Sequence, residues 1–126
     1  VTPMPTIADG TSNTVMLIET AGGPARYRRR AWHADRTTNT NSWADFRNVH
    51  VFGGCNPATG NETAIPTTLR TAALNCSNDA EPYSFHGGGV QAVRADGGVS
   101  FLRDGMTIGV MAALITRAGG EALPDF

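Results

Sequence analysis

The chain has 126 residues, with ten arginines, no lysine and eleven acidic residues, and a formal net charge of -1. This length is typical of one ordinary domain, so we expect residues 1–126 to share a single core. The near-neutral charge excludes bulk electrostatic attraction to nucleic acid or anionic lipid, and we expect no nucleic-acid partner. The absence of lysine excludes P-loop and Schiff-base chemistry and lysine-derived covalent links between subunits.

The first residues, VTPMP, do not resemble the start of a complete protein. They include no initiator methionine, no basic region and no apolar stretch of a signal peptide. No apolar run in the sequence approaches the ~20 residues that cross a bilayer. We therefore expect the chain to be the later part of a longer or processed protein.

Residues 6–14 are rich in short polar side chains around a glycine, which predicts a turn or a single helical turn. We expect capping or Asx-turn roles for four of them: Asp9, Gly10, Ser12 and Asn13. The same oxygens could hold Ca²⁺, but the spacing lacks the acidic residue that ends an EF-hand loop, so calcium is the lesser alternative. The apolar run that follows predicts a short buried strand at 15–20.

Five of the ten arginines fall within 26–36, interleaved with aromatic residues and a histidine. A strand is predicted at 27–32. The favoured interpretation is a solvated strand face or a set of salt bridges between subunits. The alternative is binding of an acidic polysaccharide or DNA, with aromatic side chains as stacking partners. The candidate ligand or subunit contacts are Arg28, Arg30, Trp32 and Trp43.

Residues 34–83 are rich in Asn, Thr, Gly and Pro without a steady apolar period, which is typical of a long loop-rich insertion at the surface. Short strands are predicted at 48–52 and 67–72. The only cysteines, Cys55 and Cys76, lie in polar surroundings without a CxxC pair and make a poor metal site. A disulfide is favoured over two free thiols, and it would place the protein outside the cytoplasm.

The last third has the clearest pattern. Strand-like runs at 89–95 and 99–103 flank Asp96-Gly97-Gly98, which predicts a β-hairpin with a three-residue loop. Pairing Ala95 with Val99 would put one apolar set on the core face, namely Val93, Ala95, Val99 and Phe101.

A helix is predicted at 108–117, because Thr107 can cap its start and Gly119-Gly120 can end it. Arg117 would lie favourably at the negative end of the helix dipole. The residues expected on its core stripe are Ile108, Met111, Ala112 and Ile115.

Nine residues separate His86 from Asp96-Gly97 within SFHGGGVQAVRADGGVSFLR at 84–103. This segment resembles the C-terminal signature of a large bacterial family of pilin-like proteins, abundant in planctomycetes, that is known by a domain of unknown function. Three further pieces resemble the same family in the same order: IADGTSNTVMLIE at 7–19, TRAGGE at 116–121 and PDF at 124–126.

The resemblance implies an α+β, pilin-like head built on an antiparallel sheet, with a C-terminal β-hairpin and helix. It also implies a hydrophobic N-terminal pilin helix, which this sequence lacks. The protein would contact a membrane only through that helix. Type IV pilins and type II secretion pseudopilins are the related classes. The partners expected from this resemblance are further copies of the chain or other filament subunits at the cell surface.

His86 and Asp96 suggest an acid–base pair or metal ligands. In the predicted hairpin, however, their side chains lie on the order of 25–30 Å apart, too far for a shared proton. We therefore expect structural roles. His86 would anchor the hairpin base by bonding Asp104 or a backbone group, and Asp96 with Gly97 would shape the turn.

No nucleophile elbow and no suitably placed cysteine or histidine set is left, so we expect no enzyme and no cofactor, and any metal is undetermined. The predicted function is that of a structural or assembly subunit of an extracellular pilus, pseudopilus or surface filament, acting by noncovalent packing. The alternative is an extracellular module that binds a polysaccharide or another solute.

Overall fold

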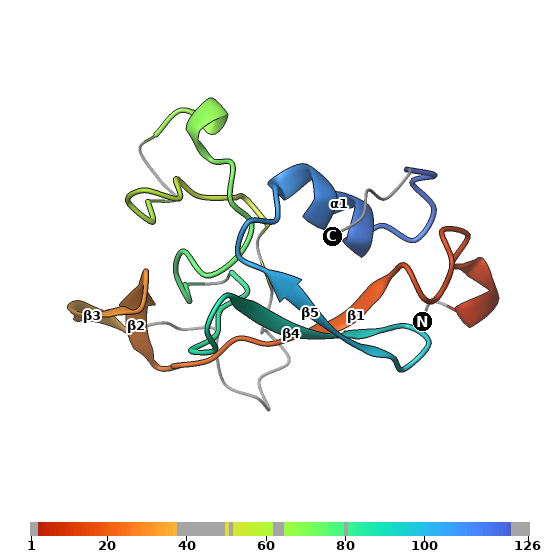
Figure 1. Cartoon of the computed structure of the whole chain (residues 1–126), viewed down its shortest axis with the longest axis horizontal. Coiled ribbons are helices and arrows are strands. Elements are labelled where there is room, and N and C mark those ends of the chain that lie inside the picture. The colour runs from red at the N-terminus through yellow and green to blue at the C-terminus, as the bar shows by residue number, and fades with distance from the viewer. Residues whose placement is uncertain (1–2, 38–49, 51, 62–64, 80, 122–126) are drawn as a thin grey trace.

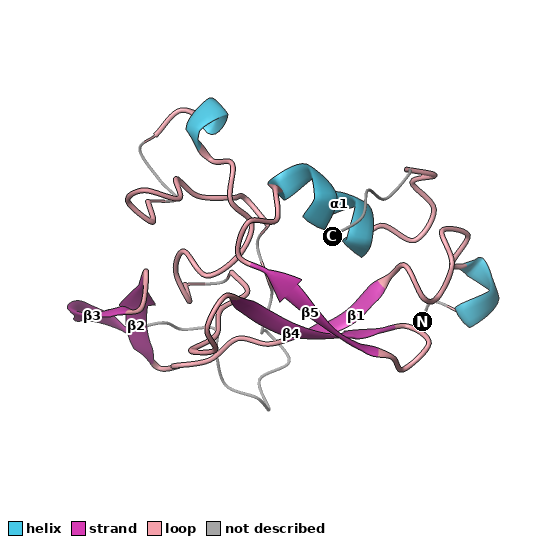
Figure 2. Ribbon diagram, viewed as in Figure 1, coloured by secondary structure: helices cyan, strands magenta, loops and turns pink. Residues whose placement is uncertain are grey.

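A computed structural model describes residues 3–37, 50, 52–61, 65–79 and 81–121. Two antiparallel sheets and one helix near the C-terminal end confirm the predicted α+β class (Figure 1; Figure 2). Within the described residues, no helix is long and apolar enough to span a membrane. In chain order the elements are η1 (Met4–Thr6), β1 (Val15–Ile18), β2 (Ala25–Arg28), β3 (Ala31–Thr37), η2 (Thr67–Leu69), β4 (Gly89–Arg94), β5 (Val99–Arg103) and α1 (Ile108–Ile115).

The predicted hairpin is present as β4 and β5, but its register differs from the expected one. Val93 lies opposite Val99, and the Arg94 N–H donates to the Gly98 carbonyl at 2.8 Å. The three-residue loop is therefore 95–97, one residue earlier than predicted. Gly97 has a φ of 87°, a conformation that residues with a side chain rarely adopt. The need for glycine at this position fixes the loop at 95–97.

Of the four residues predicted on the core face of this hairpin, Ala95 is buried, but the prediction is wrong for Val99 and Phe101. Val93, Val99 and Phe101 do share a face, but Val99 is 70% and Phe101 41% exposed. The opposite face is covered by α1, and its side chains are buried in the core cluster. That cluster comprises Ala73, Leu74, Val90, Ala92, Leu102, Met106, Met111 and Leu114.

Helix α1 begins as predicted, because the Thr107 hydroxyl accepts a hydrogen bond from the Val110 N–H. It ends at Ile115, two residues before the expected end. Met111 is buried as predicted, but the second buried residue is Leu114, whereas Ile115 is exposed. The helix therefore faces the sheet with a stripe rotated from the predicted one.

Strand β1 is present, but the prediction that it is buried is correct for only half of it. Among the described residues it pairs with β4 alone, at one edge of a sheet ordered β1-β4-β5. Val15 and Ile18 pack against the core cluster, whereas Met16 and Leu17 are exposed. The register shifts between Val15 and Leu17, as in a β-bulge.

The single strand predicted at 27–32 is in fact a hairpin, because the chain reverses within this segment. β2 pairs with β3, and Tyr27 lies opposite Trp32. The turn consists of Arg29 and Arg30, both in left-handed conformations with φ of 48° and 64°. Figure 1 places this hairpin at the opposite end of the molecule from η1.

The prediction of a surface insertion at 34–83 is wrong for its later part. Leu74 and Tyr83 are fully or nearly fully buried, and Leu74 belongs to the core cluster. The strand predicted at 67–72 is also wrong: η2 lies there, followed by an isolated bridge at Ala72. Most of the strand predicted at 48–52 lies outside the described residues.

Candidate functional site

A cavity of about 260 Å³ lies where the β2–β3 turn, the disulfide and the end of β5 meet. Its polar character comes from two arginines, an asparagine and an aspartate, and aliphatic side chains complete the wall. We call it the turn cavity. Its lining residues are Arg29, Arg30, Pro57, Ala72, Leu74, Asn75, Cys76 and Asp104.

Two hydrogen bonds from backbone N–H groups hold the β2–β3 turn against the cavity. The Arg29 N–H donates to the Cys76 carbonyl at 2.8 Å, and the Arg30 N–H donates to the Tyr83 hydroxyl at 2.8 Å. Turns of this geometry usually carry Asn-Gly, since the left-handed conformation costs an ordinary residue about 1 kcal/mol or more. Burial raises the pKa of the Tyr83 hydroxyl above its ordinary value, and the hydrogen bond that it accepts from Arg30 partly opposes this rise.

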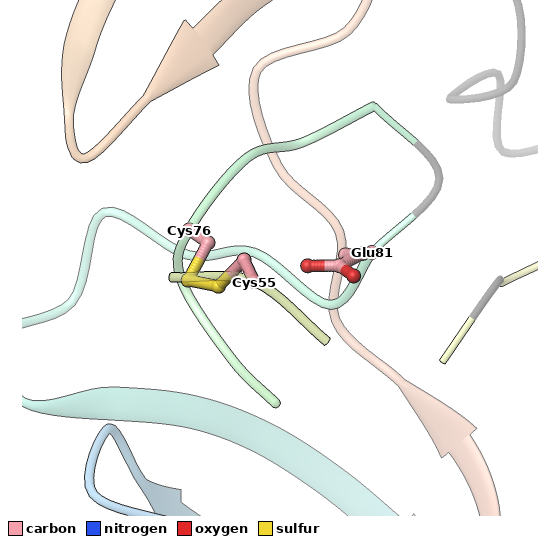
Figure 3. Close-up of side chains that lie close together, drawn as sticks. All are labelled: Cys55, Cys76 and Glu81. Carbon is pink, nitrogen blue, oxygen red and sulfur yellow. A yellow bond between two sulfur atoms is a disulfide. The ribbon is translucent and has the colours of Figure 1, made fainter. Parts of the chain in front are cut away.

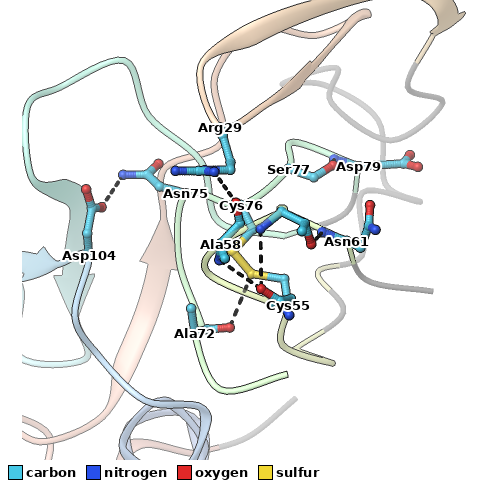
Figure 4. The surroundings of a disulfide bond; sticks show 12 residues. Arg29, Cys55, Ala58, Asn61, Ala72, Asn75, Cys76, Ser77, Asp79 and Asp104 are labelled. Atoms are coloured by element: carbon cyan, nitrogen blue, oxygen red, sulfur yellow. Dashed lines mark hydrogen bonds between the residues drawn. A yellow bond between two sulfur atoms is a disulfide. The ribbon is translucent and has the colours of Figure 1, made fainter. Parts of the chain in front are cut away.

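The Arg30 side chain joins the turn to both ends of the β4–β5 hairpin segment. Its Nη2 donates to the His86 carbonyl at 2.6 Å and lies 3.4 Å from Asp104 Oδ2. Asn75 Nδ2 donates to the other Asp104 oxygen at 2.5 Å. Figure 4 shows Asn75 between Asp104 and the disulfide region. The charged groups of the turn cavity thus hold one another in place.

The His86 ring has a partner other than the expected one. Its Nε2 lies 3.5 Å from Glu19 Oε1, and the ring is largely exposed. Asp104 is bound instead by Arg30 and Asn75. At the other end of the hairpin, Asp96 Oδ1 accepts from the Gly98 N–H at 2.8 Å, as in an Asx turn.

Asp9 forms a second polar site, where the segment before β1 meets the segment after α1. Its two oxygens accept from the Gly119 N–H at 2.8 Å and from the Gly120 N–H at 2.9 Å. These bonds hold the pKa of Asp9 below its ordinary value, chiefly through Gly120. The carboxylate therefore binds the C-terminal segment, whereas a bond within its own turn was expected.

The other residues expected in that turn contribute mainly local contacts. Asn13 Nδ2 donates to the Asp9 carbonyl at 3.0 Å, and Gly10 has a φ of 93°. The Ser12 carbonyl accepts from the Arg94 guanidinium. Together these contacts attach the turn to the sheet.

Cys55 and Cys76 form a disulfide with a Cα–Cα distance of 6.2 Å. With Glu81 they form a buried group whose potential ligand atoms lie within 4.8 Å of one another (Figure 3). Metals bind thiolates, and the disulfide occupies both sulfurs, so this group does not offer a metal site in the oxidised protein. Its role is to fix the chain beside the turn cavity (Figure 4).

The structure separates the residues expected to contact ligands. Arg30 reaches the turn cavity, whereas Arg28 donates to Asn61 Oδ1 at 3.1 Å. Trp32 is 66% exposed, and Trp43 lies outside the described residues. Sequence reasoning missed Asn75 and Tyr83, whose only signal was their position beside Cys76 and the hairpin motif. It also missed Glu19 as the partner of His86 and Arg30 as the partner of Asp104.

A family model described as "Protein of unknown function (DUF1559)" matches residues 2–107. The chain belongs to this family. The comparisons with curated proteins and with solved structures found no match. The matched range of this DUF1559 protein includes the turn cavity, the disulfide and the β4–β5 hairpin, and it ends just before α1.

Proposed function

We propose that this DUF1559 domain is a structural subunit of an extracellular pilus, pseudopilus or surface filament that assembles by noncovalent packing. The observation that carries the proposal is the outer face of the three-stranded sheet, where Leu17, Val99 and Phe101 are exposed. Apolar side chains gathered on one face are typical of a surface that another protein covers. The disulfide is compatible with an extracellular or periplasmic location.

The charged groups of the described residues also favour a structural role. Arg30, Asp104 and Asn75 bind one another and the backbone, as an anchoring network does. The lining of the turn cavity includes no histidine, serine or free thiol. The pair that resembles an acid–base unit, His86 and Glu19, is therefore separate from the cavity lining.

A binding module is the second candidate, because of one observation. The turn cavity offers Arg30, Asn75 and Asp104, side chains that hydrogen-bond sugar hydroxyls or carboxylates, and the exposed Trp32 follows two residues after Arg30. An indole ring can stack on a sugar or another flat apolar surface. The corresponding ligand would be an acidic or neutral polysaccharide.

One experiment separates the two functions. Electron microscopy of native material should show ordered fibres labelled by an antibody against this chain, and polysaccharide binding should be absent from a glycan array. Monodisperse monomers that bind a glycan, with binding lost in Trp32→Ala but kept in Leu69→Ala, would contradict the filament proposal. Leu69 is a suitable control because it is a large exposed apolar residue on η2, a different element.

A further inference from the structure

Among the described residues, no strand pairs with the outer edge of β5. Hydrogen bonds to β4 alternate along an antiparallel strand, so every second residue of β5 directs its backbone away from β4. The bond from Arg94 to Gly98 at one end and the bond from Asp104 to Gly88 at the other set this alternation. The residues whose backbone N–H groups point outward are therefore Val99, Phe101 and Arg103.

The charge of Arg103, at the end of β5, is the one feature of this edge that usually opposes strand addition. Between Gly98 and Arg103 there is no proline, charge or bulge, and the side chains of Val99 and Phe101 are exposed. The other edge strand, β1, has an irregular register, and the residues after it bond to Tyr83. The sheet is therefore open for extension at β5.

We propose that a second copy of the chain binds here, through antiparallel pairing of β5 with β5 centred on Phe101. The pairing joins the two three-stranded sheets into one continuous sheet. It places Phe101 opposite its counterpart and Val99 opposite Arg103 of the other copy. The inference deepens the proposed function, on which it rests, by naming the first subunit contact.

Charge favours a second copy over an unrelated strand. Asp96 precedes β5 and Arg103 ends it, and both are exposed. In this register Arg103 lies opposite Val99 of the other copy, three residues after the Asp96 of that copy, so the acidic turn of one copy faces the basic end of the other strand at both ends of the interface. Among the described residues, no ion pair already occupies the Arg103 guanidinium. Such a twofold contact closes on itself, so it produces dimers, and a fibre needs one further contact between dimers.

Sedimentation velocity of the whole chain, with Phe101→Arg and the control variant Leu69→Arg, tests the pairing. Leu69 is a large exposed apolar residue on η2, outside the sheet. We expect a dimer for the unaltered chain and for Leu69→Arg. Phe101→Arg should be monomeric, with at least a tenfold higher dissociation constant, because two cations would meet at the twofold axis. Circular dichroism checks that both variants fold.

Charge reversal supplies a second test, because a variant that fails to fold would not be rescued by a second charge reversal. Arg103→Glu should weaken the dimer, and the double variant Asp96→Arg/Arg103→Glu should restore it. A monomeric unaltered chain at millimolar concentration, equal effects of Phe101→Arg and Leu69→Arg, or no rescue by the double variant would each overturn the pairing.

The two proposals fail separately. Fibres that form unchanged from Phe101→Arg would overturn β5 pairing and leave the filament function in place. Dimers that depend on Phe101, in native material without fibres, would support the pairing and contradict the filament function.

Discussion

At the scale of single residues, Asp9 connects the two ends of the described chain. It lies before β1, yet its carboxylate accepts the backbone N–H groups of Gly119 and Gly120. Thr116 also donates to it, at 3.4 Å. A charged acceptor bound by backbone donors strengthens these hydrogen bonds, so the ionised form of Asp9 stabilises the folded state.

We predict that Asp9→Asn lowers the midpoint of thermal unfolding at pH 7. Since the pKa of Asp9 is lowered in the folded state, its stabilising effect is full above the ordinary value of 3.8 and is lost as the pH falls through the folded pKa. The difference between the two proteins should therefore close on acidification. Calorimetry from pH 7 to pH 2 measures it.

Glu121→Gln is the matched control, because Glu121 is exposed and accepts only a hydroxyl of Thr116. Its unfolding midpoint should follow that of the unaltered protein at every pH. An Asp9→Asn deficit that stays constant down to pH 2 would contradict an electrostatic role of the carboxylate.

At the scale of elements, the sequence predicted the hairpin and the helix but not which face of each is buried. Apolar residues occur on both faces of β5 and around much of α1, so periodicity does not select one face. The packing of Met111 and Leu114 against Val90 and Leu102 makes the selection. The hairpin of β2 and β3 was missed because Arg29-Arg30 is not a recognised turn dipeptide.

The two faces of α1 differ in a measurable way. Leu114 is fully buried, so Leu114→Ala should lower the free energy of unfolding by about 2–5 kcal/mol through lost packing and a cavity. Ile115 is partly exposed, and Ile115→Ala should cost less than about 1 kcal/mol. Urea denaturation measures both values. The reverse order would show that the predicted stripe through Ile115 faces the core.

At the scale of the whole molecule, the later part of the middle segment belongs to the core. Leu74 and Tyr83 are buried, and the disulfide fixes this segment beside the β2–β3 turn. Its polar composition hid this, because buried Asn78 and Ser84 are satisfied by hydrogen bonds or local backbone contacts that no apolar period signals. The spacing of apolar residues therefore underestimates burial in a segment that is held by side-chain hydrogen bonds and has little regular secondary structure.

The disulfide closes a sequence separation of 21 residues. We predict that Cys55→Ala/Cys76→Ala lowers the free energy of unfolding by about 3 kcal/mol, the loss expected when an unfolded loop of this length is released. Urea denaturation with and without reductant measures it. Reductant should destabilise the unaltered protein by a similar amount and leave the double variant unchanged; equal stability of all four samples would contradict the prediction.

The sequence by itself determined the positions of β1, β4, β5 and the start of α1, and the chemistry available to an arginine-only, two-cysteine chain. The positions follow from local signals, namely apolar runs, turn glycines and a threonine cap, whereas the α+β class was expected from the resemblance to a known family. Only the tertiary structure decided the buried faces, the partners of His86 and Asp9, and the turn cavity around Arg30. Each depends on contacts between residues far apart in the sequence, which chain spacing does not encode.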